Sequence, residues 1–282
     1  MEQGAAIRVG RCCYEKGKRV DPHYPGFTTI VVLTKGTSRW GALGPYELRD
    51  DAGHIMENIW QFSKVYPRVK AVCQKKSRFE DIVVWEHPAE VHLANERAPA
   101  TADNLRPEYW AWRRKGFANP HAVRYPPGYG SMAACVGSLV ETHPGEYEGP
   151  LSYVESRKAL YLPLYCRLAR QSPLFRELRR RHKQGEKLLI AEVDGPHQES
   201  LAHYQEHWGV GPAFIDAHSV AADAAALRIL LADAQHPFGH GYCLAAALQD
   251  LDADLCNRAP PAPAEPPAEL ADDDPLWAAL GL

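Results

Sequence analysis

The chain has 282 residues, of which 45% are hydrophobic and 24% are charged, a composition typical of a globular protein with a substantial core. Its net charge of −3 excludes a global basic signature, so nucleic-acid binding would need a local basic patch. No apolar run approaches the ~20 residues of a membrane helix, and the N-terminus lacks a signal-peptide pattern. Seven cysteines without a Cys-x-x-Cys pair indicate free thiols. We therefore expect an intracellular protein of a reducing compartment, cytoplasm or nucleus, with no membrane contact.

The first part of the chain predicts one strand between irregular segments. Residues 1–26 are polar and rich in Gly, Pro and Cys, which predicts irregular structure. Phe27–Leu33 is rich in β-branched residues and predicts a strand. Thr34–Leu48 is rich in turn residues, and a turn at Asp50–Gly53 leads into the next helix.

A predicted helix then carries a short polar stripe. Glu57, Gln61 and Lys64 fall on one side of it, and Ile59 and Phe62 fall on the other. Few charged residues surround the stripe, so we expect the segment to be buried or half-buried. A buried carboxylate near an amide and an amine needs partners or a substrate. The stripe either ties the helix to a neighbour by hydrogen bonds or belongs to a functional site.

The middle of the chain alternates short elements with long loops. Asp81–Trp85 predicts a strand that ends at Glu86–Pro88. Residues 94–107 predict a loop, and Glu108–Lys115 predicts a short helix. Asn119–Met132 predicts a loop of unusual Arg and aromatic content, which is either a packed surface loop or a lid over a pocket.

An arginine lies in the apolar stripe of the next predicted helix, Tyr153–Arg170. This residue, Arg157, is expected to be buried with a partner, either in an ion pair or as an anion-binding group. Pro163 is expected to kink or break the helix. The following basic run, Phe175–Lys187, is either a solvated helix face or a nucleic-acid patch.

The clearest predicted strand is Leu188–Val193. Glu192 interrupts its apolar run, and Asp194–His197 follows as a turn. Polar residues at the end of a buried strand commonly form a site.

Two apolar helices are predicted at Ala221–Asp233 and Leu244–Leu251, joined by the glycine-histidine loop His236–Gly241. This arrangement predicts a shared cleft. The spacing of His236 and His240 would suit a metal only on a helix, which the intervening Pro and Gly residues disfavour. We therefore expect no metal.

The chain ends in a predicted linker and tail. Ala259–Pro267 is almost entirely Pro and Ala and predicts a stiff, disordered linker. An acidic cluster and a short apolar segment follow it. That segment either docks on its own domain or binds a protein partner.

A set of carboxylates, cations and aromatics remains. Glu57, Glu192 and Asp194, together with Arg157 and Lys64, suit a site for a sugar phosphate or nucleotide, in which aromatic rings stack on a base. Gly-x-Gly-x-x-Gly and the phosphate-binding P-loop pattern are both absent, which disfavours those nucleotide folds.

Three segments of the chain resemble the NADAR family, whose name stands for NAD- and ADP-ribose-associated. Glu57–Lys64 resembles the family's Glu-containing helix with Gln and Lys at the same spacing. Tyr153–Leu178 resembles its Arg-x-x-x-Met-Tyr helix and the segment beyond. Asp233 with Pro237–Gly241 resembles its Asp-x-x-Trp-Gly-x-Gly motif, and Glu192 alternatively matches the Glu of the strand before that motif.

The resemblance implies an α+β, helix-rich single domain with a few short strands, spanning residues 1–257 and followed by the tail 258–282. It implies an N-glycosidase, a hydrolase acting on an ADP-ribosyl, nucleotide or modified-nucleobase compound, without a cofactor. The catalytic carboxylate it implies is Glu57 or Glu192, and Asp194 is a further catalytic candidate from the set of carboxylates above. The expected substrate-binding residues are Lys64, Trp60, Arg157, Tyr161, Phe238, Gly239 and His240.

Two other functions are consistent with the sequence. One is a nucleotide or nucleic-acid binding module without catalysis. The other is an interaction protein that its C-terminal tail recruits to a partner.

Overall fold

The computed structural model describes residues 6–16, 18–33, 38–74, 85–123 and 135–257. Several sequence predictions fall wholly or partly outside the described residues: the turn-rich segment at 34–37, the strand at 81–84, the loop at 124–132 and the tail at 258–282.

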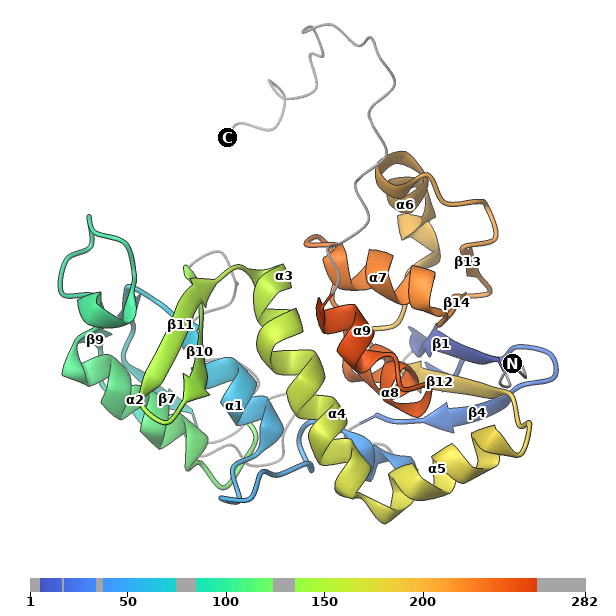
Figure 1. The fold of residues 1–282 in the computed structure, drawn as a ribbon, viewed down its shortest axis with the longest axis horizontal. Coiled ribbons are helices and arrows are strands. Elements are labelled where there is room, and N and C mark those ends of the chain that lie inside the picture. Colours follow the sequence, from blue (N-terminus) through green and yellow to red (C-terminus); the bar gives the residue numbers. More distant parts are fainter. Residues whose placement is uncertain (1–5, 17, 34–37, 75–84, 124–134, 258–282) are drawn as a thin grey trace, which may run out of the picture.

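A five-stranded sheet forms the centre of the larger half of the molecule (Figure 1). Its strands, in spatial order, are β13 (Ile215–Asp216), β14 (Ser219–Ala221), β1 (Ile7–Arg11), β12 (Leu188–Glu192) and β4 (Thr28–Val31). β12 pairs in parallel with β1 on one side and β4 on the other, while β14 is antiparallel to β1. Every residue of β12 is buried, as expected for a central strand with an apolar run, and this burial includes Glu192 at its end. The strands predicted at β12 and β4 are thus confirmed.

Helices pack around this sheet. They are α4 (Leu162–Gln171), α5 (Pro173–Lys183), α6 (Leu201–Trp208), α7 (Ala224–Ala232), α8 (His240–Leu248) and α9 (Asp252–Asn257), and a short helix, α3 (Tyr153–Ser156), precedes α4. α8 is buried along its whole length and packs against β1, β12 and α4. Among the described residues, no helix is both long enough and apolar enough to cross a membrane.

α3 and α4 form one continuous helix through a π-helical turn at Arg157–Tyr161. The helix begins at a capping box, in which Ser152 and Glu155 each bond the other's backbone N–H. Pro163 lacks an N–H, so the regular hydrogen-bond ladder is interrupted there. At the predicted kink or break, the structure has a π-helical turn just before Pro163, and the helix then continues. Such turns are frequent at functional sites.

A second, smaller core lies beside the first (left in Figure 1). It is built by α1 (Met56–Phe62), β5 (Lys64–Val65), β6 (Arg68–Val69), β7 (Val72–Gln74), β8 (Trp85–His87), β9 (Glu90–Val91), α2 (Pro107–Phe117), β10 (Gly137–His143) and β11 (Glu146–Leu151). At its centre the Phe62 ring lies 4.7 Å from the rings of both Trp85 and Trp112.

Helix α1 belongs to both cores. Met56, Ile59 and Trp60 pack into the larger core, and Phe62 packs into the smaller one. All seven residues of α1 are buried, so the predicted burial of this segment is correct. The helix ends before Lys64, which starts β5 and pairs with β10, so the predicted helix was too long.

The prediction that residues 1–26 are irregular was wrong. The segment supplies β1 and the hairpin of β2 (Cys13–Glu15) and β3 (Lys18–Val20). β1 is hard to recognise because it carries a charge in the interior. The Arg8 guanidinium donates to the Ser219 hydroxyl at 2.9 Å and lies 3.9 Å from the Tyr24 ring, which compensates for its burial.

Other differences concern element boundaries. β8 includes Glu86 and His87, which were predicted to end the strand, because both residues pair with β7. α8 begins at His240, four residues before the predicted Leu244. The helix predicted at Glu108–Lys115 is confirmed as α2. The structure thus mixes helices and strands in one domain, as expected from the sequence.

The contact between α1 and α2 gives a test of the fold. A Cβ at Gly116 would overlap the Phe62 ring, so Gly116→Ala should lower the free energy of unfolding by about 1–3 kcal/mol. Gly211→Ala is the control, since nothing lies within 4 Å of a Cβ there. Urea unfolding measures both. Equal stability of the two variants would contradict the tight α1–α2 contact.

Candidate functional site

A cavity of about 230 Å³ lies beside α1, the helix shared by the two cores. Its lining comes from α1 and β5, from the helix around the π turn, from the turn after β12 and from the loop before α8. The lining residues are Glu57, Trp60, Gln61, Lys64, Tyr153, Arg157, Tyr161, Asp194, Pro237, Phe238 and Gly239. Eight of the ten site residues predicted from the sequence are among them; Glu192 and His240 are not.

The polar stripe of Glu57, Gln61 and Lys64 forms a chain of hydrogen bonds in the cavity wall. Gln61 Nε2 donates to Glu57 Oε1 at 2.7 Å, and Lys64 Nζ donates to Gln61 Oε1. Burial lowers the pKa of Lys64 to about 8, although the Glu57 carboxylate opposes that shift. The stripe is therefore both internally bonded and part of the cavity, so the two interpretations of this segment are compatible.

Arg157 presents a buried positive charge beside the cavity. It is 1% exposed and donates to the backbone carbonyls of Asp233 at 2.7 Å and His236 at 2.6 Å. Its guanidinium also stacks on the Tyr153 ring, 3.8 Å from the ring centroid. Its expected burial with partners is confirmed. Within the described residues no carboxylate forms a salt bridge with Arg157, so its charge is solvated by dipoles and remains available to an anion.

Aromatic rings supply the apolar part of the wall. The Trp60 ring lies 5.0 Å from that of Tyr161 and 6.3 Å from that of Tyr153. Phe238 stacks on Tyr242 with 5.1 Å between centroids, so a second layer holds this ring in place. Burial raises the pKa of Tyr161 well above its usual value, which keeps its phenol neutral.

Glu192 lies behind the cavity and organises its far wall. It is completely buried at the end of β12, and Oε1 accepts the Gly241 N–H at 2.9 Å. Oε2 lies 3.0 Å from His240 Nδ1, while His240 Nε2 donates to the Val32 carbonyl at 2.8 Å. Burial lowers the pKa of His240, but the Glu192 carboxylate outweighs that effect and raises it to about 9. Glu192 and His240 therefore form a buried ion pair.

This ion pair requires glycine in the adjoining loop. A Cβ at Gly239 would lie 2.5 Å from Glu192 Oε2, and one at Gly241 would lie 2.6 Å from Glu192 Oε1. The Asp194 side chain, two residues beyond Glu192, also approaches Gly239 and reaches the cavity. Of the three predicted catalytic carboxylates, Glu57 and Asp194 thus face the cavity, and Glu192 supports it from behind.

Tyr153 and Pro237 line the cavity, but the sequence did not single them out as site residues. The position of Tyr153 four residues before Arg157, on one helix face, was a usable signal because such a pair can stack. Pro237 lies in the segment that resembles the family motif, but its contact with the cavity depends on the shape of the loop before α8. The sequence placed Gln61 in the polar stripe but predicted no catalytic or binding role for it.

The Glu192–His240 pair predicts a pH dependence of stability. The folded pKa of His240 lies above its unfolded value of about 6.5, so its contribution is complete below pH 6.5 and is lost as the pH rises toward 9. Between pH 6 and pH 8 the free energy of unfolding should fall by about 2 kcal/mol more than in His240→Asn. Urea unfolding at several pH values measures this difference. Parallel curves for the two proteins would show that His240 is neutral at pH 7.

The chain matches no family model, and no curated protein or solved structure is significantly similar to it. Inference about function therefore depends on the geometry of the cavity and on the motifs of the sequence.

Proposed function

We propose that this protein is a hydrolase with a NADAR-like fold that cleaves the N-glycosidic bond of an ADP-ribosyl, nucleotide or modified-nucleobase compound. The observation that carries the proposal is the convergence of unlike groups on one cavity. Two carboxylates, Glu57 and Asp194, and two cations, Lys64 and Arg157, line it together with aromatic rings. Separate parts of the chain supply these groups, so the fold itself assembles the set.

The cations suit the phosphate groups of such a substrate. In the part of the chain that the structure describes, Arg157 is bonded to carbonyls and not to a carboxylate, so its charge is available to attract an anion. Lys64, with a pKa of about 8, is mostly protonated at pH 7 and would add to this attraction. Trp60 and Phe238 would stack on the base or shield the ribose from water.

The carboxylates suit the bond cleavage. As the C1–N bond breaks, its electron pair stays on the base nitrogen and positive charge develops on the ribose. Glu57 would stabilise that charge, while water attacks C1 and forms the new C–O bond. Asp194 would accept the proton of that water and pass it to the leaving nitrogen. Glu192 would position the loop before α8, which lines the cavity, and would not contact the substrate itself.

A neighbouring cavity supplies the space for a larger substrate. The first cavity, at about 230 Å³, is smaller than the ~300–1,000 Å³ typical of ligand pockets. A cavity of about 480 Å³ adjoins it and shares the lining residues Tyr153 and Pro237. Its wall includes Ser138, Ser152 and Gln235, which offer hydrogen-bonding groups to a sugar or phosphate. The pair of cavities favours a dinucleotide-sized substrate over a free nucleoside.

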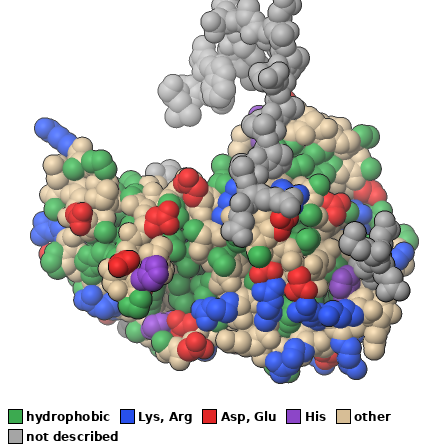
Figure 2. Space-filling view, in the orientation of Figure 1, with side chains coloured by type: hydrophobic (Ala, Val, Ile, Leu, Met, Phe, Trp, Pro, Cys, Tyr) green, Lys and Arg blue, Asp and Glu red, His purple; other side chains and the backbone are tan. Residues whose placement is uncertain are grey.

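Nucleic-acid binding has weaker support. Lys and Arg side chains gather over α5, along the lower edge of the molecule (Figure 2). Much of this charge is compensated, however, since Arg179 pairs with Asp250 and Arg181 pairs with Glu186. Exposed ion pairs of this kind reduce the net charge offered to phosphates.

The proposal is tested by turnover. The protein is incubated with NAD, ADP-ribosylated DNA and ADP-ribosyl nucleosides, and mass spectrometry detects free ADP-ribose or ribose phosphate. Glu57→Gln should lower the rate by roughly 10²–10⁴-fold while leaving substrate binding and folding intact, because the amide keeps the shape but not the charge. The matched control is Glu47→Gln, an exposed glutamate on the segment before α1, and its rate should not change.

Two outcomes would count against this function. Stabilisation by ADP-ribose without release of any product would indicate a binding module instead. Full activity in a folded Glu57→Gln protein would remove Glu57 from the mechanism.

A further inference from the structure

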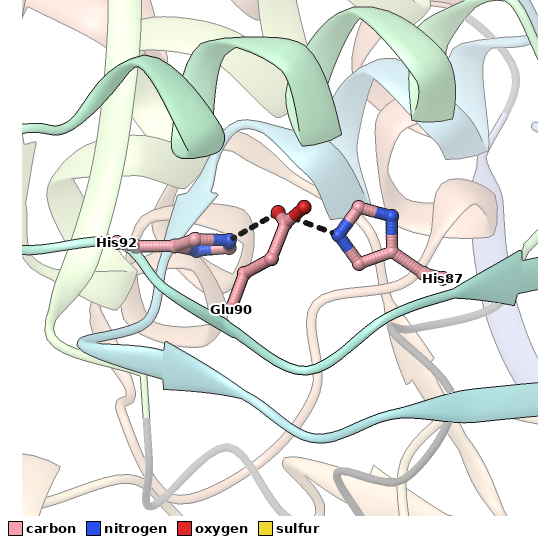
Figure 3. A group of neighbouring side chains, drawn as sticks. All are labelled: His87, Glu90 and His92. Atoms are coloured by element: carbon pink, nitrogen blue, oxygen red, sulfur yellow. Dashed lines mark hydrogen bonds and ion pairs between the residues drawn. The ribbon is translucent and has the colours of Figure 1, made fainter.

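Three metal-ligating side chains meet in the smaller core, away from the cavity. They are His87 at the end of β8, Glu90 in β9 and His92 just after it, and their ligand atoms all lie within 4.8 Å of one another (Figure 3). None of the three lines either cavity described above. We propose that this cluster binds a zinc ion, with water as the fourth ligand.

The backbone holds the three side chains in fixed positions. His87 is paired with Val72 of β7, and Glu90 is paired with Val69 of β6. The His92 N–H donates to the Pro67 carbonyl at 2.8 Å, and the His92 carbonyl accepts from Arg106 at 2.9 Å. Glu90 and His92 are two residues apart on an extended segment, so both side chains leave the same face. The cluster is therefore preorganised by three separate backbone pairings.

The distances are close to those of a tetrahedral zinc site. Glu90 Oε2 lies 2.7 Å from His87 Nε2 and 3.8 Å from His92 Nε2. Ligand atoms bound to zinc at ~2.0–2.1 Å lie about 3.3 Å apart in a tetrahedron. The observed pair of distances brackets that value, so a small movement of the Glu90 carboxylate would equalise them. Figure 3 shows both Nε2 atoms directed at this one carboxylate.

His92 lacks the partners that a buried imidazole normally has. It is completely buried, and neither ring nitrogen makes a hydrogen bond of good geometry with the described residues. A metal at this position would satisfy the Nε2 atom, which lies too far from Glu90 for a hydrogen bond.

The surroundings shield the two histidines from solvent and leave one coordination position open to water. The His87 ring stacks on Trp85, and the His92 ring lies 5.1 Å from Trp112. These rings exclude water from the histidines, while Glu90 is 19% exposed and gives access to solvent. Two imidazoles and a carboxylate with an open position are a ligand set that zinc accepts.

A second cluster, His203 with Asp233 and His236, is the poorer candidate. The Arg157 cation donates to the backbone carbonyls of both Asp233 and His236. The positive charge of this neighbouring guanidinium opposes the binding of a metal cation to the cluster. His236 and His240, whose spacing in the sequence disfavours a metal site, do not share a cluster among the described residues.

The test is zinc binding by the full chain. Thiols are first alkylated, because Cys13, Cys135 and Cys256 are partly exposed and could bind zinc themselves. Equilibrium dialysis with zinc, followed by elemental analysis, should give about one ion per chain, and zinc but not magnesium should raise the Tm. Cobalt in place of zinc should give the visible absorption of a four- or five-coordinate ion.

Variants assign the site. His87→Ala and Glu90→Gln should weaken zinc binding by at least about 100-fold, since loss of a second-shell partner alone costs 10–100-fold. Glu90→Gln keeps the shape of the side chain and guards against a folding defect. The matched control is His143→Ala, which alters an exposed His–Glu pair with the same i,i+3 spacing. Three results would each overturn the proposal. They are zinc binding that survives in both Glu90→Gln and His87→Ala, zinc binding that is lost in His236→Ala, and no zinc binding by the unchanged chain.

Discussion

The burial of one carboxylate determines much of the candidate site. Glu192 ends the central strand with no exposure to solvent, and such a charge is tolerated only with charged and hydrogen-bonding partners. His240 and the Gly241 N–H supply them, and their close approach leaves no room for a side chain at Gly239. The loop that follows α7 is therefore fixed in shape. Its carbonyls then bind Arg157, so a single buried ion pair helps to place the cation on the opposite wall.

The site also depends on a helix that serves two cores. α1 buries Met56 and Trp60 in the larger core and Phe62 in the smaller one, so neither core can shift without moving it. Of its polar residues, Glu57 and Gln61 face the cavity, while Asn58 bonds the backbone of Asn119 and Val123. The Glu57 and Gln61 side chains are almost fully buried, and they bond to one another and to Lys64. A cavity lined this way offers a substrate charged groups that are already desolvated and oriented, which is the condition for strong electrostatic effects.

The sequence predicted elements whose pattern is local, and it missed those that depend on partners far along the chain. The apolar run of β12 and the burial of Arg157 were readable because each follows from neighbouring residues. β1 was missed because Arg8, in mid-strand, is compensated by Ser219, more than two hundred residues later. The cavity residues were recognisable by type, but only the fold shows that Glu192 lies behind Asp194. Strand pairing brings His87 and Glu90 of the metal-ligating cluster together, because β8 pairs with β7 and β9 pairs with β6. Their spacing in the sequence therefore matches no helical metal motif.

The most direct test of the central claim is a crystal structure of the protein soaked with ADP-ribose. We expect the ligand in the cavity beside α1, with its ribose against Glu57 and its phosphates toward Arg157 and Lys64. An adenine or ribose ring should contact Trp60 or Phe238. ADP-ribose bound only outside this cavity, or an empty cavity at a ligand concentration that saturates binding in solution, would contradict the assignment of these residues to a ribosyl-phosphate site.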